Sequence, residues 1–189
     1  KIDVSVDQGM ILNYDKSGDL LGLTLSKETY DPEGSKAFLD DSAAQYFVIP
    51  GGDAHISTDA KIGGGSARFD GSGDSLSVPD SADWDFGTGD FTIDFRMKFN
   101  SISNQPDLIS VGGYAQSGIN ITLASGGLYI YFAGQGAKQF AWVPVTNTWY
   151  HVAFVRSGTD LKAFVNGSQI GTTLTSSGNV TSTNGVTVW

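Results

Sequence analysis

Hydrophobic and polar residues alternate with a period of two along much of this chain. In the clearest segment, 91–100, apolar side chains fill every odd position and polar side chains fill every even one. Successive side chains of a β-strand point to opposite faces, so this segment predicts a long strand with one buried and one hydrated face. The segment 149–155 is mostly apolar at positions of both parities, which predicts a central strand covered on both sides.

Shorter segments of the same character recur between turn signals. The stretch Ser125-Gly126-Gly127 marks one hairpin, and Asn166-Gly167 supplies the two residues with φ > 0 that a type I′ turn needs. No stretch keeps a helical period with caps, so the pattern predicts many short antiparallel strands in a sandwich or barrel. The further strands are predicted at 45–49, 54–57, 66–69, 75–78, 119–123, 128–132, 138–143, 161–165 and 169–174.

The two ends of the sequence differ from this pattern. Residues 1–16 hold a short alternating strand and the start of a connection over 8–18. This segment is either the first strand of the sandwich or, as we favour, an arm or linker from a preceding region, with the main domain over 17–189. The chain starts with Lys1 and ends on the strand-like residues 186–189. We therefore expect a segment of a longer protein, with the closing C-terminal strand of the domain missing.

Composition narrows the class of protein. The chain has 189 residues, no Cys, 20 acidic against 11 basic residues and a net charge of -9. The acidic balance argues against a nucleic-acid partner, and no apolar run is long enough for membrane insertion. Zero Cys removes disulfides, thiolate metal sites and Cys nucleophiles. Asp and Gly are abundant while Glu occurs only at positions 28 and 33, a composition typical of strands joined by tight turns.

Two blocks carry a family resemblance. Residues 66–100 read SARFDGSGDSLSVPDSADWDFGTGDFTIDFRMKFN, and residues 142–173 read WVPVTNTWYHVAFVRSGTDLKAFVNGSQIGTT. They resemble the laminin G-like jelly rolls of the concanavalin A-like lectin/glucanase superfamily, in the variant found in phage structural proteins and bacterial exoproteins. The match extends roughly from Leu20 to the end. It departs from the family in lacking the closing strand after Trp189, and in carrying Asn166 where an Asp is common, which suits the same turn.

The resemblance implies an all-β fold, an antiparallel jelly-roll β-sandwich. Within it, Gly71 and Gly73 are expected to adopt φ > 0, and the neighbouring Asp side chains to cap the N–H groups of their own loop. Trp84 or Phe86 is expected to pack beneath the long loop that precedes the strand at 91–100.

Catalysis finds little support in the residues. Retaining glucanases need two carboxylates about 5 to 5.5 Å apart, and in this superfamily both are Glu. Here Glu28 and Glu33 lie in a turn-like stretch. Asp90 and Asp94 share a strand face, but Asp94 belongs to a polar row that suggests a solvated face. His151 is expected to be a buried, hydrogen-bonded structural residue rather than a general base, and His55 has no catalytic partner nearby. We therefore predict that the protein is not an enzyme.

A calcium site is one alternative. Ca²⁺ takes oxygen ligands from Asp and from backbone carbonyls in loops, and the family often binds it at the rim of the sandwich. Asp70 and Asp74 are the best local pair, with a second cluster at 80–85. The competing explanation is that these side chains only shape turns, so no cofactor is required and Ca²⁺ is the one metal suggested.

A glycan-binding face is another alternative. Sugars stack their C–H faces on aromatic rings while polar side chains bind the hydroxyls. Tyr129 and Tyr131 share one face of a predicted strand. Trp142 and one of the tyrosines are equally suited to complete the core. The candidate ligand-binding residues are Tyr114, Asn120, Tyr129, Tyr131, Gln139 and Trp142.

These observations favour a non-catalytic binding or adhesion module in a larger virion protein, such as a tail fibre or capsid-associated protein, or in a secreted surface protein. Its partners would be a glycan or another host or cell-surface ligand, together with other chains of an assembly, including copies of itself. It would be found in the virion or at the extracellular surface. A purely structural decoration or fibre subunit is the alternative, followed by a glycoside hydrolase of the glucanase type.

Overall fold

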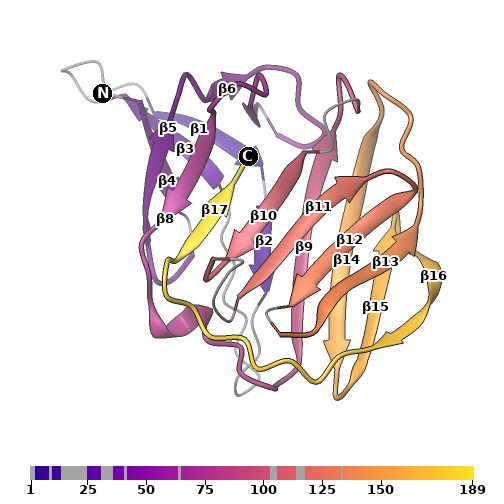
Figure 1. Cartoon of the computed structure of the whole chain (residues 1–189). Coiled ribbons are helices and arrows are strands. Elements are labelled where there is room, and N and C mark those ends of the chain that lie inside the picture. Colours follow the sequence, from indigo (N-terminus) through magenta and orange to yellow (C-terminus); the bar gives the residue numbers. More distant parts are fainter. Residues whose placement is uncertain are drawn as a thin grey trace.

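A computed structural model describes residues 3–8, 10–13, 25–30, 36–40, 42–63, 65–102, 106–113, 118–132 and 134–189. These residues form an antiparallel jelly-roll β-sandwich, as predicted (Figure 1). The part of the chain that the structure describes contains no helix with the length and hydrophobicity of a membrane span.

Two sheets make up the layers of the sandwich. The larger has ten strands, in the order β1 (Asp3–Gln8), β3 (Leu25–Tyr30), β4 (Lys36–Asp40), β5 (Phe47–Gly51), β8 (Ser75–Val78), β17 (Val186–Val188), β10 (Asp107–Val111), β11 (Ile119–Ala124), β12 (Gly127–Phe132) and β13 (Gly136–Ala141). The smaller has five, in the order β16 (Ser168–Thr175), β15 (Asp160–Val165), β14 (Trp149–Ser157), β9 (Phe91–Lys98) and β2 (Met10–Asn13). A separate hairpin pairs β6 (His55–Ser57) with β7 (Ser66–Arg68), and one short 3-10 helix covers Ala82–Trp84.

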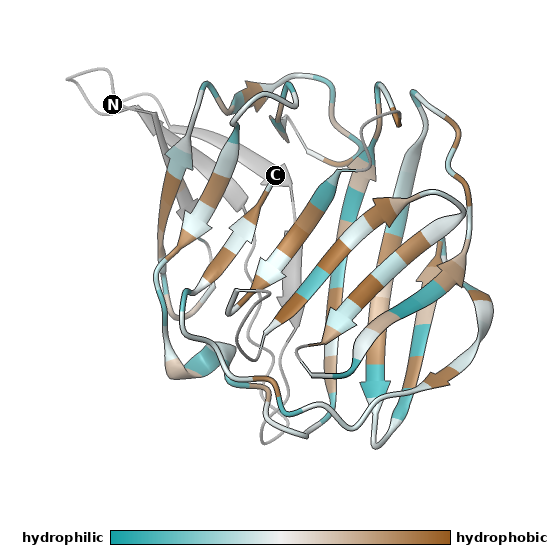
Figure 2. Cartoon of the chain, in the orientation of Figure 1, coloured by the Kyte–Doolittle hydropathy of each residue, from teal (hydrophilic) through white to brown (hydrophobic). Residues whose placement is uncertain are grey.

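The core lies between the facing sides of the two sheets. On β9, Phe91, Ile93 and Phe95 are buried, while the polar residues between them are only partly exposed. Bands of hydrophobic and polar residues alternate along the strands in Figure 2, as the period of two predicted. The central position of 149–155 is confirmed, because β14 lies between β15 and β9. The prediction that both of its faces are covered is wrong, because Ala153 and Val155, which alternate with the buried Val152 and Phe154, are only partly buried.

Several local predictions are confirmed. Asn166 and Gly167 have φ of 50° and 80° and join β15 to β16. Trp84 and Phe86 are both only 4% exposed. The strand predicted at the end of the chain is β17, which pairs with β8 on one side and β10 on the other.

Other predictions fail where pairing across the sheet decides the structure. The predicted connection over 8–18 contains β2, which pairs with β9 through Met10 opposite Phe95. Glu28 lies in strand β3 opposite Phe38, not in a turn; Glu33 lies outside the described residues. Strands β1 and β2 fall within the predicted arm, 1–16. The arm, the domain boundary at residue 17 and a closing strand beyond Trp189 stay predictions.

Loops 80–90 and 176–185 close one end of the sandwich, which we call the closed end. Figure 1 shows the second loop crossing this end, at the bottom of the view. Arg156, at 1% exposure, donates to the carbonyl oxygens of Gly89 (2.7 Å), Gly178 (2.6 Å) and Gly87 (2.8 Å), and its guanidinium lies 4.7 Å from the centre of the Phe91 ring. Burial lowers the pKa of Arg156. One buried cation therefore ties both loops to β14.

Candidate ligand-binding site

Tyr129 and Tyr131 lie together on the outer face of the ten-stranded sheet. Both belong to β12, in which Leu128, Ile130 and Phe132 point into the core. The centres of the two tyrosine rings are 6.1 Å apart, and the ring planes differ by 22°. Because the strand holds the rings nearly parallel, they present a pre-formed apolar surface of the kind on which sugar rings stack.

Polar side chains border this ring pair on the neighbouring strands. The antiparallel register places Asn120 of β11 opposite Tyr131 and Gln139 of β13 opposite Tyr129. We call these four residues the tyrosine platform. Asn120 Nδ2 donates to Asp107 Oδ1 (3.2 Å), and Asn120 Oδ1 is buried with no hydrogen-bond partner among the described residues. The sheet thus brings together four of the six predicted ligand-binding residues.

The other two predicted residues do not join the platform. Trp142 follows β13 and packs edge-on against Tyr150, with ring centres 4.9 Å apart and planes at 87°. It is half-buried against the core, which fits the alternative that it completes the core. Tyr114 lies outside the described residues.

The predicted calcium ligands, Asp70 and Asp74, lie in the turn between β7 and β8. Gly71 and Gly73 have φ of 87° and 80°, as the sequence predicted. Asp74 is buried; its Oδ1 accepts from the N–H of Asp53 (2.8 Å) and its Oδ2 from the N–H of Asp70 (2.7 Å). The expected capping role of these aspartates is therefore confirmed.

The structure adds a third carboxylate, Asp53, to this pair. Gly52, with φ of 66°, allows the close approach, because a Cβ there would collide with Asp74 Oδ1. One carboxylate oxygen from each of Asp53, Asp70 and Asp74 lies within 4.8 Å of the others. Sequence reasoning missed Asp53, although the pairing of β5 with β8 carries Gly51 to Ser75. The Gly51-Gly52-Asp53 turn was the only local signal.

The three carboxylates perturb one another. Hydrogen bonding with Asp74 and the negative charges of Asp74 and Asp70 raise the pKa of Asp53. Backbone hydrogen bonds, first from Asp70 and then from Asp53, hold the pKa of Asp74 below its usual value. The surroundings therefore favour the ionised form of Asp74, and the hydrogen bond and charge of Asp74 favour the protonated form of Asp53. We call these three residues the acidic turn.

The second predicted aspartate cluster, at 80–85, is a set of loop contacts. Asp80 accepts hydrogen bonds from the Ser182 hydroxyl and from the N–H of Gly185, and Asp85 accepts from the N–H of Ser182 (2.7 Å). Asp83 accepts from the Tyr46 hydroxyl. These carboxylates hold the loops of the closed end together.

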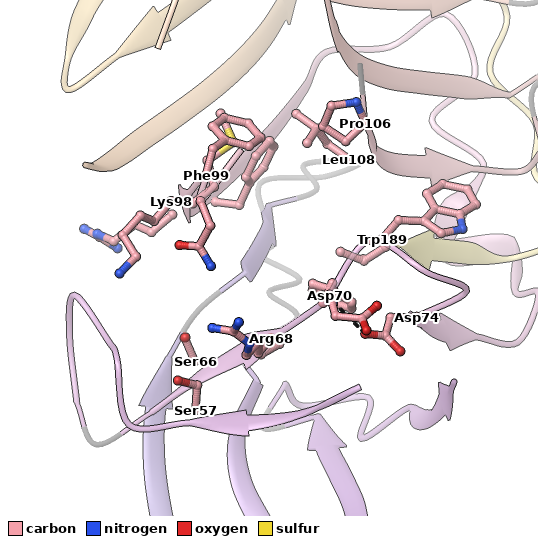
Figure 3. Close-up of a pocket in the computed structure, with 18 of the residues that line it drawn as sticks. Ser57, Ser66, Arg68, Asp70, Asp74, Lys98, Phe99, Pro106, Leu108 and Trp189 are labelled. Carbon is pink, nitrogen blue, oxygen red and sulfur yellow. Dashed lines mark hydrogen bonds between the residues drawn. The ribbon is translucent and has the colours of Figure 1, made fainter. Parts of the chain in front are cut away.

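A pocket of about 660 Å³ opens at the opposite end of the sandwich, which we call the open end. The β6–β7 hairpin, the end of β9, and the ends of β10 and β17 surround it. Figure 3 shows Arg68 and Lys98 on facing walls, with Trp189 beside Asp70 and Asp74. Asp107 also lines this pocket, so its hydrogen bond with Asn120 connects the pocket to the tyrosine platform. Neither the pocket nor its cations were predicted, because its walls come together only in the fold.

The residues weighed for catalysis have structural partners. His151 Nε2 lies 2.7 Å from Asp94 Oδ2 on the outer face of the five-stranded sheet, and its side chain is 37% exposed. The expected hydrogen bond of His151 is confirmed, and its expected burial is wrong. Asp90 accepts from the N–H of Gly158 (2.6 Å).

The fold is similar to that of botulinum neurotoxin binding domains. The serotype C1 binding domain aligns with a TM-score of 0.63 and 16% identity, over 96% of this chain and 42% of that chain. The neurotoxin DC binding domain aligns at 14% identity and over 96% of this chain and 43% of that chain, with TM-scores of 0.59 in complex with rat synaptotagmin II and 0.60 in complex with SialylT. This chain thus spans less than half of those domains, and identities this low show a shared fold alone.

Sequence comparison gives the family. No curated protein sequence shows significant similarity to the chain. Residues 70–189, more than half of the chain, match the family model described as the Concanavalin A-like lectin/glucanases superfamily. This region includes both the tyrosine platform and the end of the chain that lines the pocket. The chain belongs to the concanavalin A-like lectin/glucanases superfamily.

Proposed function

We propose that this chain is a non-catalytic binding or adhesion module that recognises carbohydrate on a cell or host surface. The observation that carries the proposal is the tyrosine platform, in which two nearly parallel rings are flanked by the amide side chains of Asn120 and Gln139. Rings supply a surface for the C–H face of a sugar, and amides bind its hydroxyls.

The platform suits binding because it is preorganised. The rings stand on a strand whose alternate side chains are locked in the core, so little conformational entropy is lost when a ligand stacks on them. Tyr129 is held further by the hydrogen bond from its hydroxyl to Ser125 O (3.2 Å). Recognition by this face needs no movement of the loops.

The wider setting of the module belongs to the same proposal. Similar folds occur in neurotoxin domains described as binding domains, including one of a toxin whose cell entry depends on two ganglioside molecules. We place this chain in a secreted surface protein or a virion protein, such as a tail fibre or capsid-associated protein, where other chains, including further copies of itself, are its neighbours. A decoration or fibre subunit with a purely structural role is the alternative.

A glycan array tests the binding role. Wild-type protein is expected to bind at least one glycan. Tyr131→Ala and Tyr129→Ala are each expected to weaken that binding about fivefold, since ring stacking contributes about 1 kcal/mol. Phe47→Ala is a matched control, because Phe47 is an aromatic residue of the same sheet, 68% exposed and away from the platform. Binding that survives loss of both rings contradicts the platform. Absence of binding to every glycan favours the structural role, and release of sugar from a glucan would favour the glucanase alternative.

A calcium site at the acidic turn is a second candidate function. Ligand oxygens about 2.4 Å from a common ion lie at most about 4.8 Å apart, and the three carboxylates meet this limit. The pKa of Asp53 is raised first by its hydrogen bond with Asp74 and then by the negative charges of Asp74 and Asp70, and a divalent cation would offset that negative charge. Asp53, Asp70 and Asp74 would hold the ion, which would brace the turn beside the pocket.

Thermal unfolding with Ca²⁺ and with chelator tests this site. The melting midpoint of the wild type is expected to rise with Ca²⁺, and that of Asp53→Asn to respond much less. Asp160→Asn is the control, because Asp160 is exposed and lies in β15, outside the acidic turn. An unchanged wild-type midpoint means that the turn binds no calcium.

A further inference from the structure

The acidic groups that line the pocket already have hydrogen-bond donors. Asp59 pairs with Lys98 Nζ, and Asp107 accepts from Asn120. Asp70 accepts from the N–H of Ser72 (2.7 Å), and both oxygens of Asp74 accept from backbone N–H groups. Each of these four carboxylates therefore already has at least one donor or cation within the protein.

Of the cationic groups at the pocket, Lys98 is paired with Asp59, whereas the two arginines are not matched in the same way. The chain has only 11 Lys and Arg residues at a net charge of -9, yet Arg68, Arg96 and Lys98 all line this one pocket. Neither arginine forms an ion pair within the described part of the chain, and Arg68 is exposed. A guanidinium presents five N–H donors in a planar fork that fits a carboxylate. The two arginines thus keep donors that no carboxylate of the described residues uses, while each pocket carboxylate already has a partner.

Aromatic and polar walls complete the pocket. Trp189 lines it and is 41% exposed, and Trp149 lines it with Lys98 Nζ 5.6 Å from its ring centre. The exposed Asn100 adds a side-chain amide. A volume of about 660 Å³ lies within the range of about 300–1,000 Å³ that is usual for small ligands. Rings, an amide and cations together match a sugar ring that carries an acidic group.

We infer that the open-end pocket binds a saccharide bearing a carboxylate, with Arg68 and Arg96 donating to the carboxylate and Trp189 contacting the sugar ring. The inference rests on the proposed function in taking a saccharide as ligand, but it concerns a different set of residues. Through Asp107 and Asn120 the pocket adjoins the tyrosine platform, so one oligosaccharide can contact both surfaces.

Titration calorimetry with two matched pairs of sugars tests the inference. The probes are trigalacturonate with its methyl ester, and sialyllactose with lactose, which separate two sources of the same carboxylate. At least one acidic sugar is expected to bind about tenfold more tightly than its neutral partner, because hydrogen bonds to charged groups contribute about 1.5–3 kcal/mol. Arg68→Gln is expected to abolish that difference. Lys162→Gln removes one positive charge from β15, outside the pocket, and is expected to keep it.

The outcomes separate this inference from the proposed function. Equal binding of acidic and neutral sugars by the wild type contradicts the inference that the pocket binds a carboxylate, and so does an unchanged preference in Arg68→Gln. In either case, binding of the neutral sugars still tests the tyrosine platform. Loss of neutral-sugar binding in Tyr131→Ala with the acidic preference intact supports both. The exposed position of Arg68 means that the variant is expected to fold normally, which circular dichroism checks.

Discussion

The two ends of the sandwich use arginine in opposite ways. At the closed end Arg156 is buried and donates to three backbone carbonyl oxygens, so its hydrogen-bonding capacity serves the fold. At the open end Arg68 is exposed, lines a pocket and forms no ion pair with a described residue. The difference shows that the residue type alone does not mark a ligand site. What marks it is hydrogen-bonding capacity that the fold leaves unused at a concave surface.

The aspartates show the same contrast. At the closed end Asp80 and Asp85 accept hydrogen bonds from the loop 176–185, and Asp83 accepts from the hydroxyl of Tyr46. At the open end the acidic turn gathers three carboxylates within 4.8 Å, at the cost of mutual repulsion. The hydrogen-bonded aspartates of the closed end stabilise the fold. The acidic turn concentrates charge beside a pocket, as a binding site does.

The largest expected change in stability comes from removing the hydrogen bonds that Arg156 makes at the closed end. Arg156→Met should lower the free energy of unfolding by about 3 kcal/mol or more, because three carbonyl groups, that of the buried Gly178 among them, lose the donor that the buried guanidinium supplies. Urea unfolding measures the change, and Arg68→Met is the control, with an expected change within about 0.5 kcal/mol at an exposed site. If both variants lose the same stability, the contrast between the two arginines is wrong.

A smaller change in the free energy of unfolding is expected when the pH is lowered, because Asp74 at the open end becomes protonated. Because the pKa of Asp74 is lowered in the folded state, its stabilising contribution is present above the usual Asp value of about 3.9 and is lost as the pH falls through the folded value. The raised pKa of Asp53 has the opposite sign, and its contribution is lost as the pH rises through its folded value. The stability of Asp74→Asn should therefore fall less steeply than that of the wild type below about pH 4. Parallel curves for the two proteins would contradict this assignment.

The smallest change in stability is expected from Asp53→Asn. This variant isolates the repulsion among the three carboxylates of the acidic turn. Without Ca²⁺ at neutral pH, the variant should melt slightly above the wild type, because the amide removes one of three neighbouring negative charges. Calorimetric melting in chelator measures the shift. Asp160→Asn should show no such gain, since Asp160 faces Lys162 at 3.7 Å. A lower midpoint for Asp53→Asn would mean that its carboxylate is needed by the fold.

Local pattern predicted the parts of the molecule in which one segment determines its own structure. The alternation over 91–100 and 128–132 gave β9 and β12, and with them the shared face of Tyr129 and Tyr131. Gly71, Gly73 and Asn166 adopt the positive φ that their turn signals indicate. Period and turn chemistry are local properties, so a single sequence carries them.

The features that the sequence did not predict depend on contacts between segments that are distant along the chain. Asp53 reaches Asp74 only because β5 pairs with β8, and the pocket needs β7, β9, β10 and β17 at one end of the sandwich. Strand β2 joins β9 although its short segment looks like a connection. Trp142 was a candidate for the glycan face, but the fold sets its ring against Tyr150. In each case register across the sheet decided the outcome, and no local pattern encodes that register.

The most direct test of the account is a map of backbone amide shifts by NMR during titration with sialyllactose. We predict perturbed amides at the open end, around Arg68 and at 96–100, together with the platform strands β11 and β12. The closed-end loops around Gly87 and Gly178 should not respond. Perturbations centred on the closed end, or none with any of the four sugars, would contradict the claim that the open end and the tyrosine platform form the binding surface.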